Sequence, residues 1–542
     1  MNIGRPAKKI ICLGMTAILI SGIISSVDAG NDAYAASNNV NVIMMIPDGE
    51  SVSEVTLARW YNGGKLNIDE MTCGLVRTYS AESAITDSAA AATAYACGIK
   101  TNEGYEGIYP SVVNMPGVSD TGVHTAQQPA ANIIEAARLA GKKTGIVVTA
   151  PVMHATPASF SAHNEDREEY DTISMQQVYQ GIDVVMGGGL YYMKDGRRDR
   201  QDLTLDIQNR GYDYVTTKEQ MNNSQSDKLF GVFAYDDMDY DFDMADHPEE
   251  PSLAEMTRKA IDVLDKNENG FFLLVEGSKI DYASHAHDPV GVVSEILSYD
   301  EAVKTALDFA KKDGNTVVIS AADHGNGNMS IGVGQSGYAS TSIYEYLTPL
   351  KAASRTGAGV LQKLNADRSN ANYVVSSYYG ISDLTEEEIE KIRSTDQVMA
   401  TVGRMMSKRA NIGWMEASGH TGEDVTLNVY APEGMERLTG VVDNTDVNKY
   451  MERLMGLDLA QTSEKLFCPA RAAFEAKGAS ISWDGSDEQN PNIVVRKGDQ
   501  TVTLPINKSV AYVGNDCIQL SGLVILSGGN TYVPSDAVEL IN

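Results

Sequence analysis

Six near-continuous apolar runs, separated by helix-like stretches, constrain the fold of this chain more than any other feature. Continuous hydrophobicity is typical of strands that are covered on both faces of a sheet. Helical patterns lie between the runs, at residues 130–139, 253–264 and 293–311. This order predicts an α/β fold, a three-layer sandwich with a central, mostly parallel sheet. The six runs are residues 40–46, 145–149, 184–186, 271–275, 316–320 and 425–430.

Side chains that bind metals or act in catalysis follow most of these runs. Ligands in parallel sheets gather beyond the carboxyl ends of the strands, so we expect these side chains to meet at one edge. So many carboxylates, imidazoles and hydroxyls at the ends of buried strands predict a multi-metal site around a serine. The segments are Asp48, residues 86–88, 154–156 and 276–285, Asp323 with His324, and His420.

Ser88 lies at the expected start of a helix, because alanines follow it and Gly98 suits the helix end. The helix dipole and the free N–H groups favour an anion there, which suits a nucleophile in phosphate chemistry. The sequence shows no G-x-S-x-G motif and no obvious histidine base near Ser88, so activation would have to come from a metal. The alternative is an ordinary helix cap.

Asp281 and His285 are four residues apart, so one helical turn would place both on the same face. A carboxylate and a neutral imidazole suit zinc, whereas Glu276 offers an oxygen to a harder ion such as magnesium. A solvated helix face is the alternative for this segment. Asp48 could be a turn residue, and a lone Asp-His pair such as Asp323-His324 is weak evidence for a metal site. Only the combination of all these groups favours one.

The two ends of the chain differ from its centre in their pattern of apolar and polar residues. Lys8 and Lys9, the apolar residues 10–24 and the small residues near 33–35 predict a secretory signal peptide over residues 1–35, and hence a secreted, extracellular or periplasmic protein without a membrane span. Short strand-like runs separated by turn residues predict a small β domain over residues 475–542. Its ending, residues 530–534, resembles the N-terminal β domain of copper amine oxidases.

Two polar regions, near residues 190–250 and 330–412, are expected to be surface insertions in a catalytic domain that spans residues 36–460. In the second region, Thr385 predicts a helix start, with a charged helix that continues to about Lys408.

The net charge of −30 argues against nucleic acid or anionic lipid as a partner. An acidic protein with an anionic substrate needs a positive local site, which bound metals and one arginine would supply. Four cysteines follow the predicted signal peptide, and they allow three pairings or free thiols. Their spacing favours Cys73–Cys97 and Cys468–Cys517.

Over residues 40–435 the chain resembles the alkaline phosphatase family. The matching motifs are P-D-G (47–49), T-D-S-A-A-A-A-T-A (86–94), H-A-T-P-A (154–158), V-E-G-S-K-I-D-Y-A-S-H (275–285), A-D-H-G (322–325) and S-G-H-T-G-E-D-V (418–425). The resemblance implies hydrolysis of phosphate monoesters through a phosphoserine, with release of inorganic phosphate. It also implies two Zn²⁺ and one Mg²⁺ as cofactors.

The resemblance assigns a role to each matching residue. Ser88 would be the nucleophile and Arg167 the bidentate clamp on the phosphate, although Arg167 taken alone would read as a salt-bridged surface residue. The first zinc would be held by Asp281, His285 and His420, the second by Asp48, Asp323 and His324 beside Ser88, and the third metal by Asp48, Thr156 and Glu276.

Two departures from the family pattern lie near the third metal. His154 stands where some members carry aspartate, and Tyr282 stands where lysine, histidine or tryptophan can occur. The alternatives to a phosphomonoesterase are a phosphodiesterase or sulfatase-like hydrolase of the same superfamily, and a metal-loaded surface protein without activity. The resemblance allows a homodimer, and the β domain would bind a cell surface or another protein.

Overall fold

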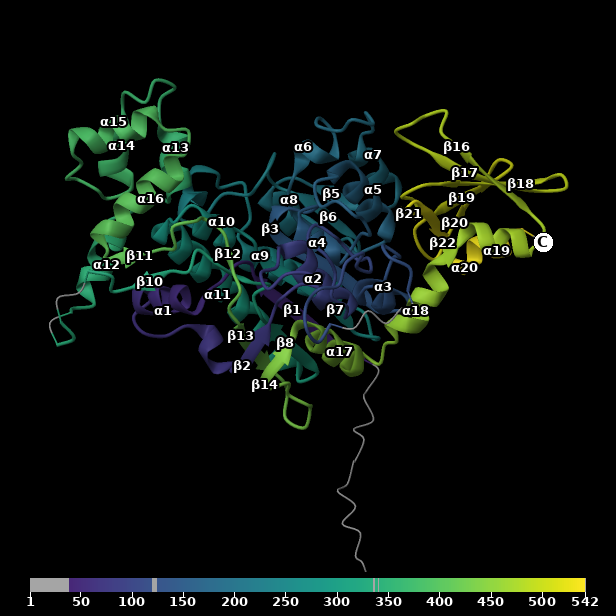
Figure 1. Cartoon of the computed structure of the whole chain (residues 1–542), viewed down its shortest axis with the longest axis horizontal. Coiled ribbons are helices and arrows are strands. Elements are labelled where there is room, and N and C mark those ends of the chain that lie inside the picture. The colour runs from purple at the N-terminus through teal and green to yellow at the C-terminus, as the bar shows by residue number, and fades with distance from the viewer. Residues whose placement is uncertain (1–38, 119–123, 335–336, 340, 542) are drawn as a thin grey trace, which may run out of the picture. The chain divides into compact units, whose positions relative to one another are not determined.

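The computed structural model describes residues 39–118, 124–334, 337–339 and 341–541, so the expected signal peptide lies outside the described residues. Within these residues the centre of the fold is a ten-stranded sheet, in which only β13 runs antiparallel to its neighbours. In spatial order the strands are β14 (Gly440–Asp443), β2 (Thr72–Arg77), β13 (Val425–Tyr430), β8 (Thr316–Ser320), β1 (Asn41–Pro47), β7 (Phe271–Gly277), β3 (Lys143–Pro151), β4 (Val184–Gly188), β6 (Leu229–Val232) and β5 (Asp213–Val215) (Figure 1).

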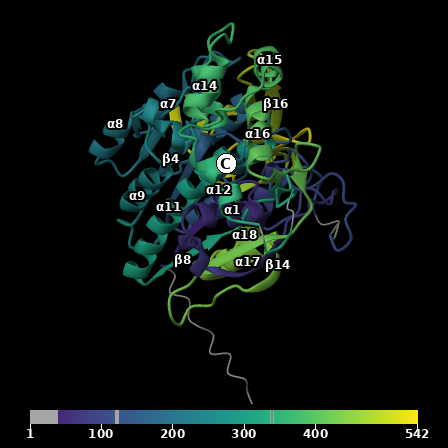
Figure 2. The same ribbon diagram turned by 90° about the vertical axis from the view of Figure 1, so that its left-hand side faces the viewer.

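Alternate side chains of β1 enter two different hydrophobic cores. Ile43 and Met45 belong to one core, whereas Val42, Met44 and Ile46 belong to the other. Helices cover both faces, and α9 and α11 lie side by side (Figures 1 and 2). The predicted three-layer α/β fold is therefore confirmed. The helices of the first face are α1 (Val52–Tyr61), α9 (Leu253–Leu264) and α11 (Pro289–Asp313), and those of the second are α2 (Ser88–Cys97), α3 (Ile133–Leu139) and α17 (Asn444–Met455).

Residues 190–250 differ from the surface insertion expected there. They contain β5 and β6, which extend the central sheet because β6 pairs parallel to β4 and β5 pairs parallel to β6. The polar residues of this region lie in its connections, while the strands themselves are short, which hides them from a hydropathy pattern. The helices of the region are α6 (Leu190–Met193), α7 (Leu203–Asn209), α8 (Lys218–Asn223) and the 3₁₀ helix η2 (Asp241–Asp246).

Residues 330–412 form a helical region. The expected helix start at Thr385 is present, and its hydroxyl accepts the N–H of Glu388. The single charged helix is replaced by two, because the chain turns extended at Thr395, whose hydroxyl accepts the N–H of Gln397. The region contains β10 (Ser330–Ile331), α12 (Tyr344–Lys351), α13 (Gly357–Lys363), α14 (Ala371–Tyr378), α15 (Glu386–Ser394), α16 (Val398–Arg409) and β11 (Ile412–Gly413).

A small β-rich part, here called the β module (residues 467–541), follows α18 (Leu459–Leu466). It has its own hydrophobic core, which includes Phe474, Val495 and Leu504. Its first strand and helix begin before residue 475, the boundary expected from the sequence. Its elements are β15 (Cys468–Pro469), α19 (Ala470–Ala476), β16 (Ser480–Asp484), β17 (Asn492–Lys497), β18 (Gln500–Pro505), β19 (Val510–Val513), β20 (Asp516–Gln519), β21 (Ile525–Ser527), β22 (Asn530–Val533) and α20 (Ser535–Glu539).

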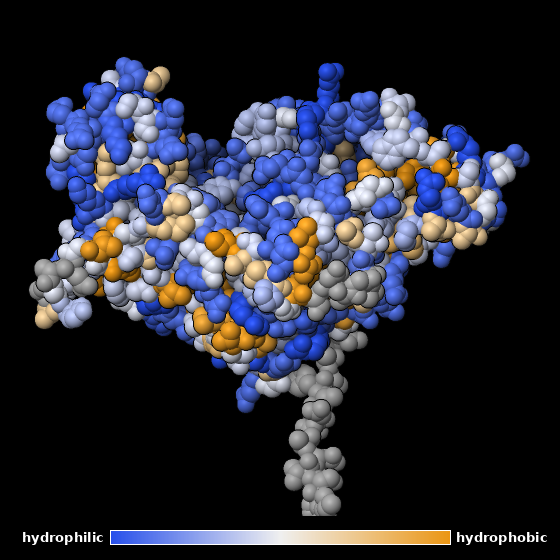
Figure 3. All heavy atoms as spheres, viewed as in Figure 1, coloured by the Kyte–Doolittle hydropathy of each residue, from blue (hydrophilic) through white to orange (hydrophobic). Residues whose placement is uncertain are grey.

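The face drawn in Figure 3 is largely polar, and the four cysteines that follow the expected signal peptide do not pair. Hydrophilic side chains cover most of the face drawn in Figure 3, with small apolar patches between them. Among the described residues, no helix has the length and apolar character needed to cross a bilayer. Cys73, Cys97, Cys468 and Cys517 are all free thiols, so neither favoured pairing forms.

Candidate metal centre and nucleophile

Three neighbouring strands place three carboxylates at one edge of the sheet. β8, β1 and β7 are adjacent and parallel, so their carboxyl ends meet. Asp48 follows β1, Asp323 follows β8, and Glu276 lies at the end of β7. All three side chains are fully buried.

The reversed strand β13 explains how His420 reaches the same edge. The amino end of β13 lies where its neighbours have their carboxyl ends, and His420 precedes that end. β12 (His420–Thr421) pairs with β9 (Gly325–Asn326), directly after His324. Because the Nδ1 atom of His420 bonds to the carbonyl of Thr86 at 2.8 Å, its Nε2 atom remains available as a ligand.

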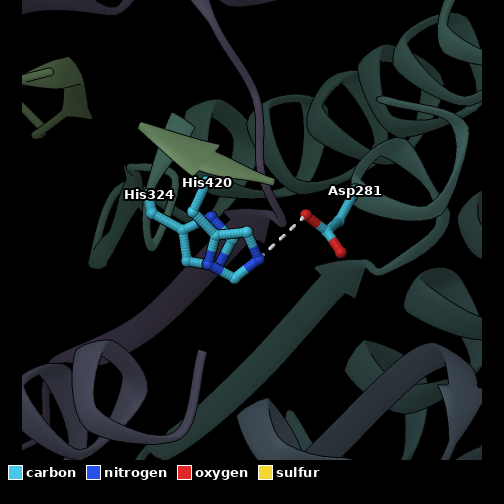
Figure 4. A group of neighbouring side chains, drawn as sticks. All are labelled: Asp281, His324 and His420. Carbon is cyan, nitrogen blue, oxygen red and sulfur yellow. Dashed lines mark ion pairs between the residues drawn. The ribbon is translucent and has the colours of Figure 1, made fainter. Parts of the chain in front are cut away.

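The first cluster consists of Asp281, His285 and His420. Asp281 and His285 lie one turn apart on α10 (Lys279–His285). The His285 Nε2 atom is 3.3 Å from Asp281 Oδ2 and 3.3 Å from His420 Nε2, and His420 Nε2 is 3.7 Å from Asp281 Oδ1. Figure 4 shows His420 facing Asp281, with His324 stacked on His420 at a ring distance of 3.6 Å. Asn326 orients Asp281 by donating to Oδ1 at 2.7 Å.

The second cluster consists of Asp48, Asp323 and His324, with Ser88 beside it. One ligand atom from each of the first three lies within 4.8 Å of the others. The Nε2 atom of His324 is 3.2 Å from Asp323 Oδ2, 3.7 Å from Asp48 Oδ1 and 3.1 Å from the Ser88 hydroxyl. Carboxylates, imidazole and hydroxyl therefore converge on one small volume.

The third cluster shares Asp48 with the second and adds His154 and Glu276, again within 4.8 Å. Thr156 lies on the short helix α4 (Ala155–Ser159) and is fully buried. Tyr282 meets the edge of His154 at a ring distance of 5.8 Å. Burial and the nearby Arg167 lower the pKa of His154 to about 3, so its imidazole is neutral and able to bind a cation.

The acidic side chains of these clusters lack the partners that buried charges require. Both carboxylate oxygens of Asp48 and of Glu276, one of Asp323, and the Thr156 hydroxyl have no hydrogen-bond partner among the described residues. Burial and the neighbouring carboxylates raise the pKa of Asp48 well above its ordinary value, and burial raises that of Glu276 to about 8. Unpaired buried carboxylates are costly, and divalent cations would satisfy them, so the donor set fits bound metal ions.

Ser88 is the first residue of α2, and its side chain is almost fully buried. The helix begins there because the Asp87 side chain accepts the N–H of Ala90 at 3.1 Å, and it ends at Gly98 in the left-handed conformation. The hydroxyl therefore lies at a positive helix end and beside the second cluster.

Arg167 reaches the site from the loop before α5 (Tyr170–Gln180). Its Nη1 atom donates to Asp87 Oδ2 at 3.1 Å, and its Nη2 atom lies 3.3 Å from His154 Nε2. Burial opposes the charge of this arginine, but the carboxylates of Asp87 and Glu106 outweigh it and raise the pKa above its ordinary value. A permanent cation is thus held between Asp87, the residue before Ser88, and His154 of the third cluster.

Sequence reasoning gave no role to Asp87 or Asn326. Asp87 both caps α2 and binds Arg167, and an aspartate directly before an alanine-rich helix is a recognisable cap signal. Asn326 binds Asp281 from a loop with the sequence Gly-Asn-Gly-Asn, which contains no signal that distinguishes one asparagine from the other.

Four further histidines lie outside the three clusters. His163 pairs with buried Glu135, His124 stacks on Tyr109, and His287 stacks on Trp414. His247 lies close to Asp239 and Glu250, but there the imidazole and the Asp239 carboxylate bond to each other.

Comparison with known families gives two matches along the chain. The profile described as alkaline phosphatase matches residues 39–457, and that of the copper amine oxidase N-terminal domain matches residues 455–541. Alkaline phosphatase 4 of Bacillus subtilis is 33% identical, over 81% of this chain and 95% of its own length. The repressible alkaline phosphatase of Saccharomyces cerevisiae is 31% identical, over 84% of this chain and 88% of its own length.

Solved structures give the same result. The alkaline phosphatase of Thermus thermophilus has a TM-score of 0.69 at 28% identity, and the match covers 78% of this chain and 93% of that one. The cold-active enzyme of the psychrophile Shewanella sp. has a TM-score of 0.66 at 27% identity, covering 77% and 99%. A histidine-to-aspartate mutant of the alkaline phosphatase from the Antarctic bacterium TAB5, described with Mg bound in its M3 site, has a TM-score of 0.55 at 26% identity, covering 77% and 98%.

Proposed function

The chain belongs to the alkaline phosphatase family and hydrolyses phosphate monoesters, and we propose that Ser88 is its nucleophile and Arg167 its phosphate clamp. The observation that carries this assignment is the buried Ser88 hydroxyl at a helix N-terminus, 3.1 Å from a histidine of a carboxylate-rich cluster. The oxygen of Ser88 bonds to phosphorus as the bond to the leaving oxygen breaks. Water then hydrolyses the phosphoserine, which releases inorganic phosphate and restores the hydroxyl.

Two Zn²⁺ and one Mg²⁺ are the cofactors that we propose for this site. Bound divalent ions would lower the pKa of the Ser88 hydroxyl and stabilise the entering and leaving oxygens of the displacement. The proposal is supported by the donor types in each cluster, since imidazole with carboxylate suits zinc and oxygen donors suit magnesium. Asp281, His285 and His420 would hold the first zinc, Asp48, Asp323 and His324 the second, and Asp48, Thr156 and Glu276 the magnesium.

Arg167 suits the recognition of a phosphoryl group. Its planar guanidinium can donate two parallel hydrogen bonds to two phosphoryl oxygens, which a lysine cannot do. Asp87 already accepts from one of its nitrogens and so orients the group. His154 leaves the third cluster with an imidazole in place of a carboxylate, so the magnesium assignment rests on Asp48, Thr156 and Glu276 alone.

A phosphodiesterase or a sulfatase-like hydrolase of the same superfamily is the second candidate. Such relatives usually lack the third metal group, and the buried Thr156 and Glu276 beside Asp48 therefore favour the monoesterase. We also propose export from the cell, on the basis of the N-terminal sequence. A homodimer, and a cell surface or another protein as the partner of the β module, remain predictions.

The test compares p-nitrophenyl phosphate with bis-p-nitrophenyl phosphate, using full-length protein loaded with zinc and magnesium. We expect turnover of the monoester to exceed that of the diester by a large factor. Preferential turnover of the diester, or of a sulfate ester, would transfer the assignment to the second candidate. The absence of turnover on all three substrates in metal-loaded protein would contradict both.

A further inference from the structure

The β module contacts the segment that carries Arg167. This segment, here called the Arg167 loop (residues 160–169), connects α4 to α5. Among the described residues, none of the β module belongs to the three clusters or to the hydrogen bonds and ion pairs of Arg167. The module nevertheless reaches the residues directly before Arg167 in three separate ways.

The first contact runs through Gln176 of α5. Its Oε1 atom accepts the backbone N–H of His163 at 2.7 Å, and its Nε2 atom donates to the backbone carbonyl of His163 at 3.1 Å. The same Nε2 donates to Asn507 Oδ1 of the β module at 3.1 Å. Gln176 is buried, so it depends on these partners to satisfy its amide. Asn507 thereby fixes the side chain that holds the backbone of the Arg167 loop.

The second contact is made by the ring of His163. Its Nδ1 atom lies 2.7 Å from the Gly107 carbonyl and its Nε2 atom 3.0 Å from the Glu135 carboxylate. Phe467 of the β module meets the ring edge-on, at 4.8 Å between centroids and an angle of 71°. The module therefore closes the buried pocket in which this ring sits.

The third contact begins at Ser527. Its hydroxyl donates to the Gln127 carbonyl at 2.6 Å, and the Gln127 amide donates to Glu165 of the Arg167 loop at 2.7 Å. Gln127 adopts φ 61°, a left-handed conformation that is unfavourable for residues other than glycine. A partner is needed to keep Gln127 in this conformation, and Ser527 provides one.

The contacts matter because Arg167 lies only a few residues beyond His163 and Glu165. Asn164, between them, exchanges two backbone hydrogen bonds of 2.9 Å with Glu106, so the first half of the loop is fixed on several sides. The long arginine side chain has many rotamers, and the position of its guanidinium depends on where its backbone is held.

We propose that the β module is a positioning element for Arg167, in which Phe467, Asn507 and Ser527 hold the Arg167 loop in the geometry that binds phosphate. The module thus sets the affinity of the site for phosphate and phosphate esters without touching them. This inference rests on the proposed role of Arg167 as the phosphate clamp.

The experiment uses the double variant Asn507→Gly with Ser527→Ala in the full chain. Glycine keeps the left-handed backbone of residue 507, at φ 65°, while it removes the amide that binds Gln176. We expect KM for p-nitrophenyl phosphate to rise about fivefold, the effect of losing roughly one hydrogen bond, with kcat unchanged or higher because phosphate leaves faster. The dissociation constant for inorganic phosphate, measured by calorimetry on zinc- and magnesium-loaded protein, should rise by the same factor.

Gln519→Ala is the matched control, because Gln519 accepts from Arg210 at 3.3 Å, in a contact of the module that does not lead to the Arg167 loop. This variant should keep the wild-type KM. In an Arg167→Ala background, the double variant should cause no further loss of phosphate affinity, since the group that it positions is already absent.

Unchanged KM and phosphate affinity in the double variant would overturn the inference. It would also be overturned if the double variant lowered phosphate affinity by the same factor in the Arg167→Ala background as in the wild type. A fall in kcat that parallels a lower unfolding midpoint would show a merely structural role, and would overturn it too. If the double variant does not fold, Ser527→Ala alone gives the same comparison. Because calorimetry needs no turnover, a failure of the proposed hydrolase activity would be distinguishable from a failure of the positioning role.

Discussion

At the scale of single residues, Ser88, His324 and Asp323 are the residue types of a catalytic triad, but their geometry is different. In a triad the serine and the carboxylate bond to opposite nitrogens of the histidine. Here the Ser88 hydroxyl and the Asp323 carboxylate both approach Nε2, while Nδ1 has no partner among the described residues. Groups that converge on one nitrogen surround a common point, which is the arrangement of ligands around a cation.

Replacement of Ser88 by alanine removes the proposed nucleophile but none of the carboxylate or imidazole donors. We therefore expect phosphomonoesterase turnover to fall by about 100-fold or more, with metal content near normal. Turnover with p-nitrophenyl phosphate and metal analysis on the same preparation check this, with Ser111→Ala, an exposed serine, as the control. Wild-type turnover in Ser88→Ala would remove Ser88 from its role.

At the scale of helices and strands, α2 shows how one residue can serve both a fold and a site. Asp87 accepts the N–H of Ala90 with one carboxylate oxygen. With the other it accepts from Gly104 and from Arg167. The start of the helix that presents Ser88 is thus tied to the loop that presents Arg167.

Two substitutions at Asp87 separate its role as the cap of α2 from its charged contact with Arg167. Asparagine also caps helices, whereas alanine does not, so Asp87→Ala should lose about 1 kcal/mol of unfolding free energy and Asp87→Asn much less. Chemical denaturation of the metal-loaded proteins measures both values. Equal destabilisation by the two substitutions would mean that the charge, and not the cap, supports the helix.

The elements that sequence could predict are those with a strong local signal. Each of the six apolar runs is a strand of the central sheet, and α9 covers the expected residues 253–264. β5 could not be found in this way, because three residues beside polar connections carry no periodic pattern. The break between α15 and α16 depends on one hydrogen bond at Thr395, which competes locally with the helix.

In the candidate site, too, some features have a signal in the sequence and others do not. The motifs bring together residues from six distant segments, and strand ends predict where such residues collect. Neither the stacking of His324 on His420 nor the binding of Asn326 to Asp281 could be expected, because both depend on the reversal of β13 and its neighbouring loops.

At the scale of the whole molecule, buried acidic groups link stability to pH and to metal. Burial raises the pKa of Glu50 and of Glu295 to about 8, as it does for Glu276 in the third cluster. Their ordinary value is 4.5, so in the metal-free fold these groups hold protons that the unfolded chain releases. These protonated groups stabilise the metal-free fold fully at pH values below their pKa in the unfolded chain. This contribution to the free energy of unfolding is lost as pH rises through about 8.

Protein stripped of metal by a chelator should therefore have an unfolding midpoint lower by about 5 °C or more at pH 8 than at pH 5. Metal should reduce this difference, because bound cations stabilise the ionised carboxylates of the clusters at alkaline pH. Thermal scans of stripped and reloaded protein at both pH values show whether the unfolding midpoint falls or rises between pH 5 and pH 8. A metal-free midpoint that rises from pH 5 to pH 8 would contradict it.

The free state of the four thiols has a practical consequence for the biology and handling of this protein. Among the described residues no disulfide joins distant segments, so the catalytic fold and the β module are held by packing, hydrogen bonds and ion pairs. Mild reductants should therefore leave the architecture intact.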